Sequence, residues 1–153
     1  MQLVVLGSGD WEYEAFFKEL AAAFPEKVGL RLGFVPDMAR KIYAGSDLFL
    51  MPSKSEPCGL SQMVALRYGS IPIIRETGGL KDTITDSGDG KGNGFTFKSY
   101  DAYDMLDAIR RSLAAYADKD GWQKLVARAL KCDNSWGKSA NEYIRLYKEI
   151  LKG

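Results

Sequence analysis

The sequence predicts an α/β fold built on a parallel β-sheet with helices on both of its faces. Short β-branched or leucine-rich runs alternate with amphipathic helical patterns along the chain, as in repeated β-α-β units. The 153 residues suit one domain with a core of its own. Hydrophobic residues make up 46% of the chain and charged residues 27%, which excludes a disordered chain.

The first two predicted strands are each followed by a helix. Residues 3–6 form the first strand, and the glycine-containing turn 7–10 leads into a helix with Asp10 as its N-cap. The second strand is expected over residues 28–34. The next helix opens at Pro36, because proline is tolerated in the first turn of a helix.

The middle of the chain predicts a buried strand and the loop that follows it. A continuous apolar run at residues 48–51 is typical of a central parallel strand that is buried on both faces. Residues 53–57 form a loop, and a helix is expected from about residue 59 to residue 68. Gly69 ends this helix as its C′ residue, and the strand 71–74 follows.

The last part of the chain is mostly helical. A turn at residues 77–79 and a mobile surface loop at residues 86–93 precede a short strand over residues 94–97. Three helices then follow, the last with a predicted capping box of Ser139 and Glu142. Their apolar stripes are marked by Met105, Leu106, Ile109 and Leu113, by Trp122, Leu125 and Leu130, and by Tyr143, Tyr147, Ile150 and Leu151.

Composition and charge exclude several classes of function. The 21 basic and 20 acidic residues leave a formal charge of +1 without a cationic block, so we expect neither nucleic acid nor a membrane as a partner. No apolar run approaches the ~20 residues that cross a bilayer. The chain has no histidine, which removes a Ser-His-Asp triad and imidazole metal ligands. Two separated cysteines, Cys58 and Cys132, favour a reducing, cytoplasmic location.

Residues 41–82 carry the most specific pattern in the sequence. Five short motifs stand in this segment: YAG at 43–45, FLMPS at 49–53, EPCGL at 56–60, ALRYG at 65–69 and TGGL at 77–80. Together they resemble, nearly residue for residue, the glycogen and starch synthases that use ADP-glucose, which are retaining glycosyltransferases of the GT-B fold. The similarity extends from Leu3 to the last predicted helix.

The resemblance implies a Rossmann-like domain of which the chain holds a part. Relatives begin this domain one strand and one helix earlier and carry an N-terminal acceptor domain, so residues 1–153 are interpreted as a single truncated C-terminal domain. The family's strand order is 3-2-1-4-5-6, and closure without strand 1 gives about five strands in the order 2-1-3-4-5. A strand-swapped dimer that fills the gap is the alternative.

The EPCGL segment is the centre of the predicted site. It lies at the carboxyl end of a predicted strand and leads into a helix N-terminus, where free amides attract phosphate. By resemblance, Cys58, Gly59 and Leu60 present backbone groups to glucose and the distal phosphate, and Ser61 offers a hydroxyl. A Cβ at Gly59 would crowd the ligand. The resemblance makes Glu56 the catalytic carboxylate, which stabilises the charge developing on the sugar ring. A solvated loop carboxylate is the alternative interpretation of Glu56.

Three further residues are candidates for the nucleotide side of the site. Phe34 stands where relatives place an aromatic ring against adenine, and core packing explains it equally well. Arg75 and Thr77 follow the next strand and either contribute to nucleotide binding or have ordinary surface roles. Val64 stands where many glycosyltransferases have a second glutamate, which the glycogen synthase group also lacks. Arg40 replaces a histidine that is common in the family.

The predicted function is that of the donor-binding part of a glycogen or starch synthase. Such an enzyme transfers glucose from ADP-glucose to the non-reducing end of an α-1,4-glucan with retention, without a metal or another cofactor. ADP and ADP-glucose are the expected ligands, and the glucan acceptor is expected on the absent N-terminal domain. The chain alone is expected to be inactive, because the phosphate-neutralising arginine and lysine of relatives lie in the absent part. The alternatives are a stand-alone nucleotide- or glucan-binding module and a related retaining glycosyltransferase with another donor, such as UDP-glucose.

Overall fold

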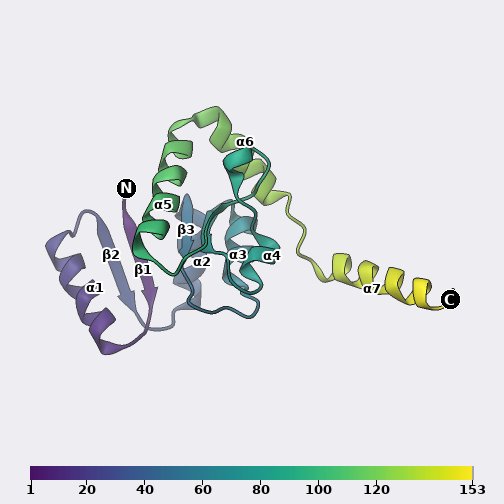
Figure 1. Cartoon of the computed structure of the whole chain (residues 1–153). Coiled ribbons are helices and arrows are strands. Elements are labelled where there is room, and N and C mark those ends of the chain that lie inside the picture. The colour runs from purple at the N-terminus through teal and green to yellow at the C-terminus, as the bar shows by residue number, and fades with distance from the viewer. Residues whose placement is uncertain (153) are drawn as a thin grey trace. The chain divides into compact units, whose positions relative to one another are not determined.

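The computed structural model describes residues 1–152, in which parallel strands alternate with helices (Figure 1). This arrangement confirms the predicted α/β class. In chain order, the elements are β1 (Leu3–Gly7), α1 (Trp11–Ala23), β2 (Val28–Leu32), α2 (Pro36–Gly45), β3 (Leu48–Met51), α3 (Ser61–Tyr68), β4 (Ile71–Arg75), α4 (Leu80–Thr83), the 3₁₀ turn η1 (Ser87–Asp89), β5 (Phe95–Phe97), α5 (Ala102–Ala117), α6 (Lys119–Leu130) and α7 (Trp136–Ile150).

The chain divides into two compact units, of which the first comprises residues 1–46. In this unit β1 and β2 pair in parallel, from Leu3 opposite Val28 to Gly7 opposite Leu32. Helix α1 packs against β2. All residues of this unit are described, and none is fully buried. A pair of strands with one packed helix therefore has little core of its own.

The second unit, from Asp47 onward, is built on a three-stranded parallel sheet. Its order is β3-β4-β5, with Leu48 opposite Ile71 and Ile73 opposite Phe95. Helices α3, α4 and α6 pack against β4, and α5 packs against β4 and β5. The prediction that residues 48–51 form a central strand is wrong, because they form β3 at the edge of this sheet, and β4 is its centre. Strands β3 and β4 are both continuous apolar runs, so the sequence alone did not show which of them is central.

The strands form two sheets, and the predicted single sheet of order 2-1-3-4-5 is wrong. Within each sheet the predicted neighbours are correct, since β2 lies beside β1 and β4 lies between β3 and β5. Among the described residues no ladder joins β1 to β3. The ladders join strands that follow one another in the chain inside one compact unit, whereas β1 and β3 belong to different units.

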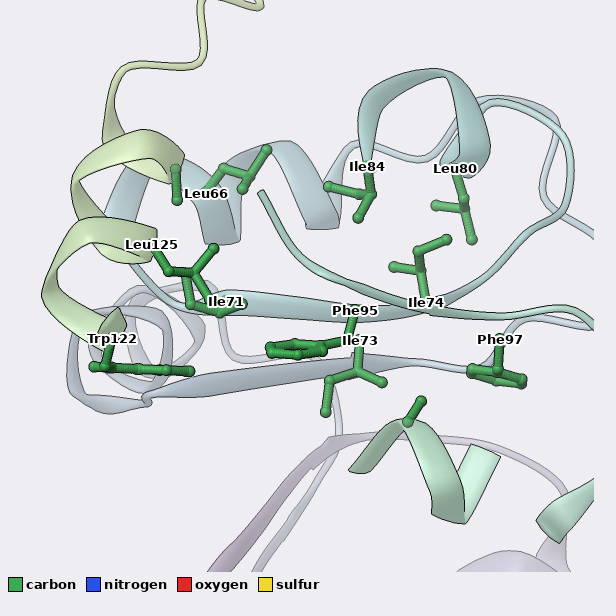
Figure 2. Close-up of a cluster of buried hydrophobic side chains, with 12 residues drawn as sticks. Leu66, Ile71, Ile73, Ile74, Leu80, Ile84, Phe95, Phe97, Trp122 and Leu125 are labelled. Carbon is green, nitrogen blue, oxygen red and sulfur yellow. The ribbon is translucent and has the colours of Figure 1, made fainter. Parts of the chain in front are cut away.

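The core of the second unit gathers around β4. Residues Ile71 and Ile74 are fully shielded from solvent, and Ile73 is 2% exposed. Figure 2 shows Ile74 pointing toward Leu80 and Ile84, whereas Ile73 points to the opposite face of the strand. The cluster is completed by Leu66, Phe95, Phe97, Ala108, Trp122, Leu125 and Ala129. Helices thus cover both faces of this sheet, as predicted.

The predicted start of α7 is wrong, whereas the predicted end of α3 is correct. Helix α7 begins after Ser135, whose hydroxyl accepts a hydrogen bond from the amide of Lys138 at 3.4 Å, so the predicted capping box of Ser139 and Glu142 is wrong. The serine one turn earlier already caps the helix, which leaves Ser139 inside it. Gly69 is confirmed as the glycine that ends α3, with φ +76°.

The glycine-rich segment 86–93 is folded on itself by hydrogen bonds. The carboxylate of Asp86 accepts from the amide of Gly88 at 2.8 Å, and that of Asp89 accepts from the amide of Lys91 at 2.8 Å. The Asn93 side chain accepts from the amide of Thr85 and donates to the carbonyl of Thr83. Short polar side chains bond to nearby backbone in this way in turns. The segment is therefore an ordered connection that leads into β5.

Candidate functional site

The EPCGL segment lies in the loop of residues 53–60, which connects β3 to α3. Its last residue, Leu60, is the N-cap of α3, and no side chain caps this helix end. The first amides of α3 therefore lack a side-chain acceptor. These amides and the helix dipole give the N-terminus a partial positive charge, which suits an anionic group such as phosphate. The Leu60 side chain is 69% exposed and Cys58 is exposed, so the loop presents its end to solvent.

The 53–60 loop rests directly on the glycine pair of the TGGL motif. The amide of Gly79 donates to the carbonyl oxygen of Pro57 at 3.2 Å. A Cβ built on Gly79 would lie 2.5 Å from the carbonyl oxygen of Cys58, and one built on Gly78 would overlap the carbonyl oxygen of Glu56. The φ of Gly78 is +46°, which also favours glycine. The two segments thus meet backbone to backbone, which explains the glycine pair.

Gly59 is required by the fold, a reason that sequence analysis did not find. Its φ is +76°, and a Cβ there would lie 2.6 Å from Oε1 of Gln62 and 2.8 Å from Cδ2 of Leu80. The expected crowding of a ligand is therefore not needed to explain this glycine. Both neighbours belong to the chain itself, so a larger residue would displace the loop from α3 and α4.

Gln62 is a buried residue of the site that the sequence analysis missed. It is fully shielded from solvent, and its Nε2 donates to the carbonyls of Gly59 at 2.9 Å and Cys58 at 3.3 Å. The same nitrogen donates to Oγ1 of Thr83 at 3.1 Å, while Oε1 has no partner among the described residues. A signal was present, because Gln62 shares the buried face of α3 with Leu66, four residues later.

Arg75 makes contacts that sequence analysis did not foresee. Its Nε donates to the carbonyl of Ser53 at 3.0 Å, and its Nη2 donates to the carbonyl of Lys54. Its Nη1 donates to the carbonyl of Lys98 at 3.4 Å, and the guanidinium carbon lies 5.5 Å from the centre of the Tyr100 ring. The structure therefore brings Arg75 to the start of the loop that carries the candidate catalytic residue.

Glu56, Ser61 and Thr77 occupy half-buried positions around the helix N-terminus. Within residues 1–152, the Glu56 carboxylate has no hydrogen-bond or ion-pair partner in the chain. The Thr77 amide donates to the carbonyl of Arg75 at 2.8 Å, and the Thr77 carbonyl accepts from the amide of Leu80 at 3.1 Å. Glu56 is thus available to a ligand, whereas the backbone of Thr77 closes its own turn.

Phe34 lies in the first unit, directly after β2. Its side chain is 92% exposed, so the alternative that it packs in a core is wrong. The preceding Gly33 has φ +106°, and its amide donates to the carbonyl of Gly7 at 2.8 Å. This local geometry leaves the Phe34 ring without packing partners in its own unit, which is unusual for a large apolar side chain.

An ion-pair network links β5 to α5 and to the residue that follows β4. Asp86 accepts from the amide of Thr96 at 2.8 Å and from Nη1 of Arg111 at 2.9 Å. Burial raises the pKa of Asp86, but the Thr96 amide and the Arg111 guanidinium outweigh it and hold the pKa below its ordinary value. The hydroxyl of Thr96 donates to Glu76 at 2.7 Å. Glu76 follows Arg75 directly, so this network adjoins the end of β4.

Two features are absent from residues 1–152. No helix in this part of the chain is long and apolar enough to span a membrane. No group of three or more histidine, cysteine, aspartate or glutamate residues in the same range is placed to hold a metal ion.

The structure is that of an α/β protein with an uncapped helix N-terminus after the carboxyl end of β3. The chain belongs to the group 1 glycosyl transferases, whose family model matches residues 1–128. It is 55% identical to a glycogen synthase of Geobacillus thermodenitrificans and 54% identical to one of Geobacillus stearothermophilus. Each alignment covers 99% of this chain and 32% of the relative, so the chain spans about a third of these proteins.

The chain is also similar to a solved structure of a starch synthase. The catalytic domain of starch synthase IV from Arabidopsis thaliana, bound to ADP and acarbose, matches with a TM-score of 0.86 and 39% identity. The match covers 99% of this chain and 33% of that one. The similarity to glycogen and starch synthases inferred from the motifs is thus confirmed over nearly the whole chain.

Proposed function

We propose that this chain is the donor-binding part of a glycogen or starch synthase. The enzyme would transfer glucose from ADP-glucose to the non-reducing end of an α-1,4-glucan with retention of configuration. The observation that carries the proposal is the EPCGL backbone, which is held on the Gly78–Gly79 pair and ends at the uncapped N-terminus of α3. The identity to glycogen synthases and the likeness to a starch synthase structure support it.

The donor diphosphate is proposed to bind at the first turn of α3. Backbone groups of Cys58, Gly59 and Leu60 would contact glucose and the distal phosphate, and Ser61 would add its hydroxyl. Amides fixed in this way stabilise the negative charge that develops on the leaving diphosphate. Glu56 would accept hydrogen bonds from the sugar and stabilise the positive charge on its ring. We propose no metal and no other cofactor for this step.

The nucleotide side of the site is proposed to include Phe34, Arg75 and Thr77. An aromatic ring stacks on adenine through its flat face, and the exposed ring of Phe34 is free to do so. Support for ADP as the nucleotide comes from the starch synthase structure, which was bound to ADP. Both Arg75 and Thr77 stand at the carboxyl end of β4, where parallel sheets bind ligands. Thr77 would lie beside the nucleotide, and Arg75 would act through the backbone of the 53–60 loop, to which it donates.

The remaining parts of the proposal concern the whole protein. The α-1,4-glucan acceptor would bind a part of the enzyme outside this chain, and the chain alone would transfer no glucose. Location in the cytoplasm is proposed from the two free cysteines, Cys58 and Cys132. A strand-swapped dimer of the chain stays a prediction, which sedimentation at several protein concentrations would test.

Calorimetric titration with ADP tests the nucleotide site. We expect binding to the wild-type chain and a weaker affinity for Phe34→Ala, because the stacking face is lost. Tyr13→Ala is the matched control, since Tyr13 is a second exposed aromatic residue of the first unit, on α1, and should leave the affinity unchanged. Equal affinities of wild type and Phe34→Ala would remove Phe34 from the site. Tighter binding of UDP than of ADP would favour another sugar nucleotide as the donor.

A further inference from the structure

The last residue of the central strand connects three backbone segments. Arg75 ends β4, and its Nε and Nη2 donate to the carbonyls of Ser53 and Lys54, which follow the neighbouring strand β3. Its Nη1 donates to the carbonyl of Lys98, which follows β5 on the other side. A single guanidinium thus spans the carboxyl ends of all three strands of this sheet. No substrate is needed to explain these contacts.

An aromatic ring covers the same guanidinium. The guanidinium carbon lies 5.5 Å from the centre of the Tyr100 ring, within the range of a cation–π contact. Arg75 is half-buried, while Tyr100 is 64% exposed, so the ring lies on the solvent side of the group. Arginine stacks on aromatic faces while its in-plane N–H groups stay free to donate, which allows both kinds of contact at once.

We infer that Arg75 is a positioning residue, which holds the 53–60 loop in place and acts on the donor through that loop. The carbonyl of Lys54 lies two residues before Glu56, so the clamp fixes the loop just before its candidate catalytic carboxylate. At its other end, Gln62 donates to the carbonyls of Cys58 and Gly59. The loop is therefore fixed at both ends, by Arg75 from β4 and by Gln62 from α3. The consequence for the donor rests on the function proposed above.

Substitution by lysine distinguishes this role from a direct contact with the donor phosphates. A guanidinium has five N–H groups in a rigid fork, and here one N–H group of each nitrogen donates to a protein carbonyl. A lysine ammonium keeps the positive charge but is a single point and cannot reproduce three separated contacts. Arg75→Lys therefore keeps the positive charge that would attract a phosphate and removes the separate hydrogen bonds that hold the loop.

Hydrogen exchange of the chain without nucleotide is the first test. The reporter is the amide of Gly79, which donates to the loop carbonyl of Pro57. In Arg75→Lys we expect this amide to exchange about tenfold faster than in wild type, because the bond breaks whenever the freed loop opens. Amides of α6 should be unchanged, which shows that the variant is folded. Arg110→Lys, an exposed arginine on α5, is the matched control and should leave the exchange of Gly79 unchanged. Exchange of Gly79 within twofold of wild type in Arg75→Lys would overturn the inference.

Titration with ADP is the second test. Arg75→Lys should lose affinity by about the same factor as Arg75→Ala, since both variants release the loop and only one loses the charge. Faster exchange of Gly79 with unchanged ADP affinity would overturn the link to the donor. Wild-type affinity in Arg75→Lys together with a loss in Arg75→Ala would show a direct charge contact and overturn the inference as well. If the wild-type chain binds no ADP, the proposed function fails, while the exchange experiment still decides whether Arg75 holds the loop.

Discussion

Replacement of Gly79 by alanine tests whether the 53–60 loop rests on the glycine pair. The backbone of Gly79 is ordinary, with φ −66° and ψ −11°, so alanine adds no conformational strain there. The added Cβ would lie 2.5 Å from the carbonyl oxygen and 2.7 Å from the Cα of Cys58. Because both atoms are backbone, neither can move aside by rotating a side chain. Gly79→Ala must therefore push the two segments apart.

The size of the effect follows from two opposing contributions. Forcing an extra group into a packed position costs about 1–3 kcal/mol, and a backbone obstacle places this case toward the upper end. Alanine also restricts the unfolded chain, which stabilises the folded state by about 0.4–1 kcal/mol and offsets part of that cost. We expect Gly79→Ala to lower the free energy of unfolding by about 2 kcal/mol. Moving the loop should also weaken ADP binding.

Two other glycines separate steric overlap from backbone strain. Gly90 has φ +76° and open space around its Cβ position. Gly90→Ala therefore costs only the strain of a left-handed backbone, about 1–2 kcal/mol, which is partly offset by the lower entropy of the unfolded chain. At Gly78 both contributions apply, because its φ is +46° and a Cβ would overlap the carbonyl oxygen of Glu56. The predicted order of destabilisation is Gly78→Ala, then Gly79→Ala, then Gly90→Ala.

Urea unfolding followed by tryptophan fluorescence measures all three variants. Trp122 is 8% exposed in the core of the second unit, so its emission reports the unit that holds these glycines. Trp11 and Trp136 are exposed and add a nearly constant background. If Gly79→Ala unfolds at the same urea concentration as Gly90→Ala or a higher one, the two segments are not in backbone contact and the argument fails.

Three further predictions address charge and catalysis. In the full-length enzyme, Glu56→Ala should reduce kcat strongly while stability changes by no more than ~0.5 kcal/mol, and a normal kcat would remove Glu56 from the mechanism. Asp86→Asn should lower stability by about 1–2 kcal/mol at pH 7 through weaker bonds to Thr96 and Arg111. The Asp86 pKa in the folded chain is below the ordinary 3.8, so its stabilisation is present above pH 3.8 and is lost as pH falls through the folded-state pKa. Wild type and Asp86→Asn should therefore converge in acid unfolding, and a constant difference would contradict the assignment. Gln62→Glu should lower the free energy of unfolding more at pH 8 than at pH 5, because a buried carboxylate would face the carbonyls to which Gln62 now donates. Urea unfolding at the two pH values measures this difference, and Gln62→Met should show no such pH dependence.

Local sequence patterns predicted the order of the strands and of the longer helices, because each depends on residues close in the chain. The short elements α4 and η1 were not predicted. The helix end at Gly69 was correct, since a left-handed C′ residue strongly favours glycine. Periodicity also located Trp122 and Leu125 on the buried face of α6. The predicted apolar stripe of α7 is exposed instead, with Tyr143 60% and Ile150 66% exposed. The start of α7 was predicted one turn too late, because both Ser135 and Ser139 satisfy the local pattern of a cap. Choosing between two such patterns requires the hydrogen bond itself.

Strand pairing and side-chain contacts were not predictable in the same way. Pairing between β1 and β3 depends on the direction and twist of strands far apart in the chain, which no local pattern records. The contacts of Arg75 reach segments more than twenty residues away on both sides, so its sequence neighbours gave no sign of them. Gln62 was missed because its buried hydrogen bonds to Cys58, Gly59 and Thr83 join segments that no local pattern connects. The EPCGL motif was recognised as a whole, while the reasons for its individual residues came only from the structure.

Contact between the 53–60 loop and the glycine pair through main-chain atoms has a consequence for how the site tolerates mutation. The atoms of residues 56–58 nearest to the Cβ positions of Gly78 and Gly79 are all main-chain atoms, so the side chains of Glu56 and Cys58 are not among them. Substitutions of those side chains should change what the loop recognises and leave its position intact. In a saturation library selected for folding alone, positions 56 and 58 should accept many residues, whereas positions 78 and 79 should retain glycine. Sugar or nucleotide preference could thus be altered by replacing loop side chains, without rebuilding the surface beneath them.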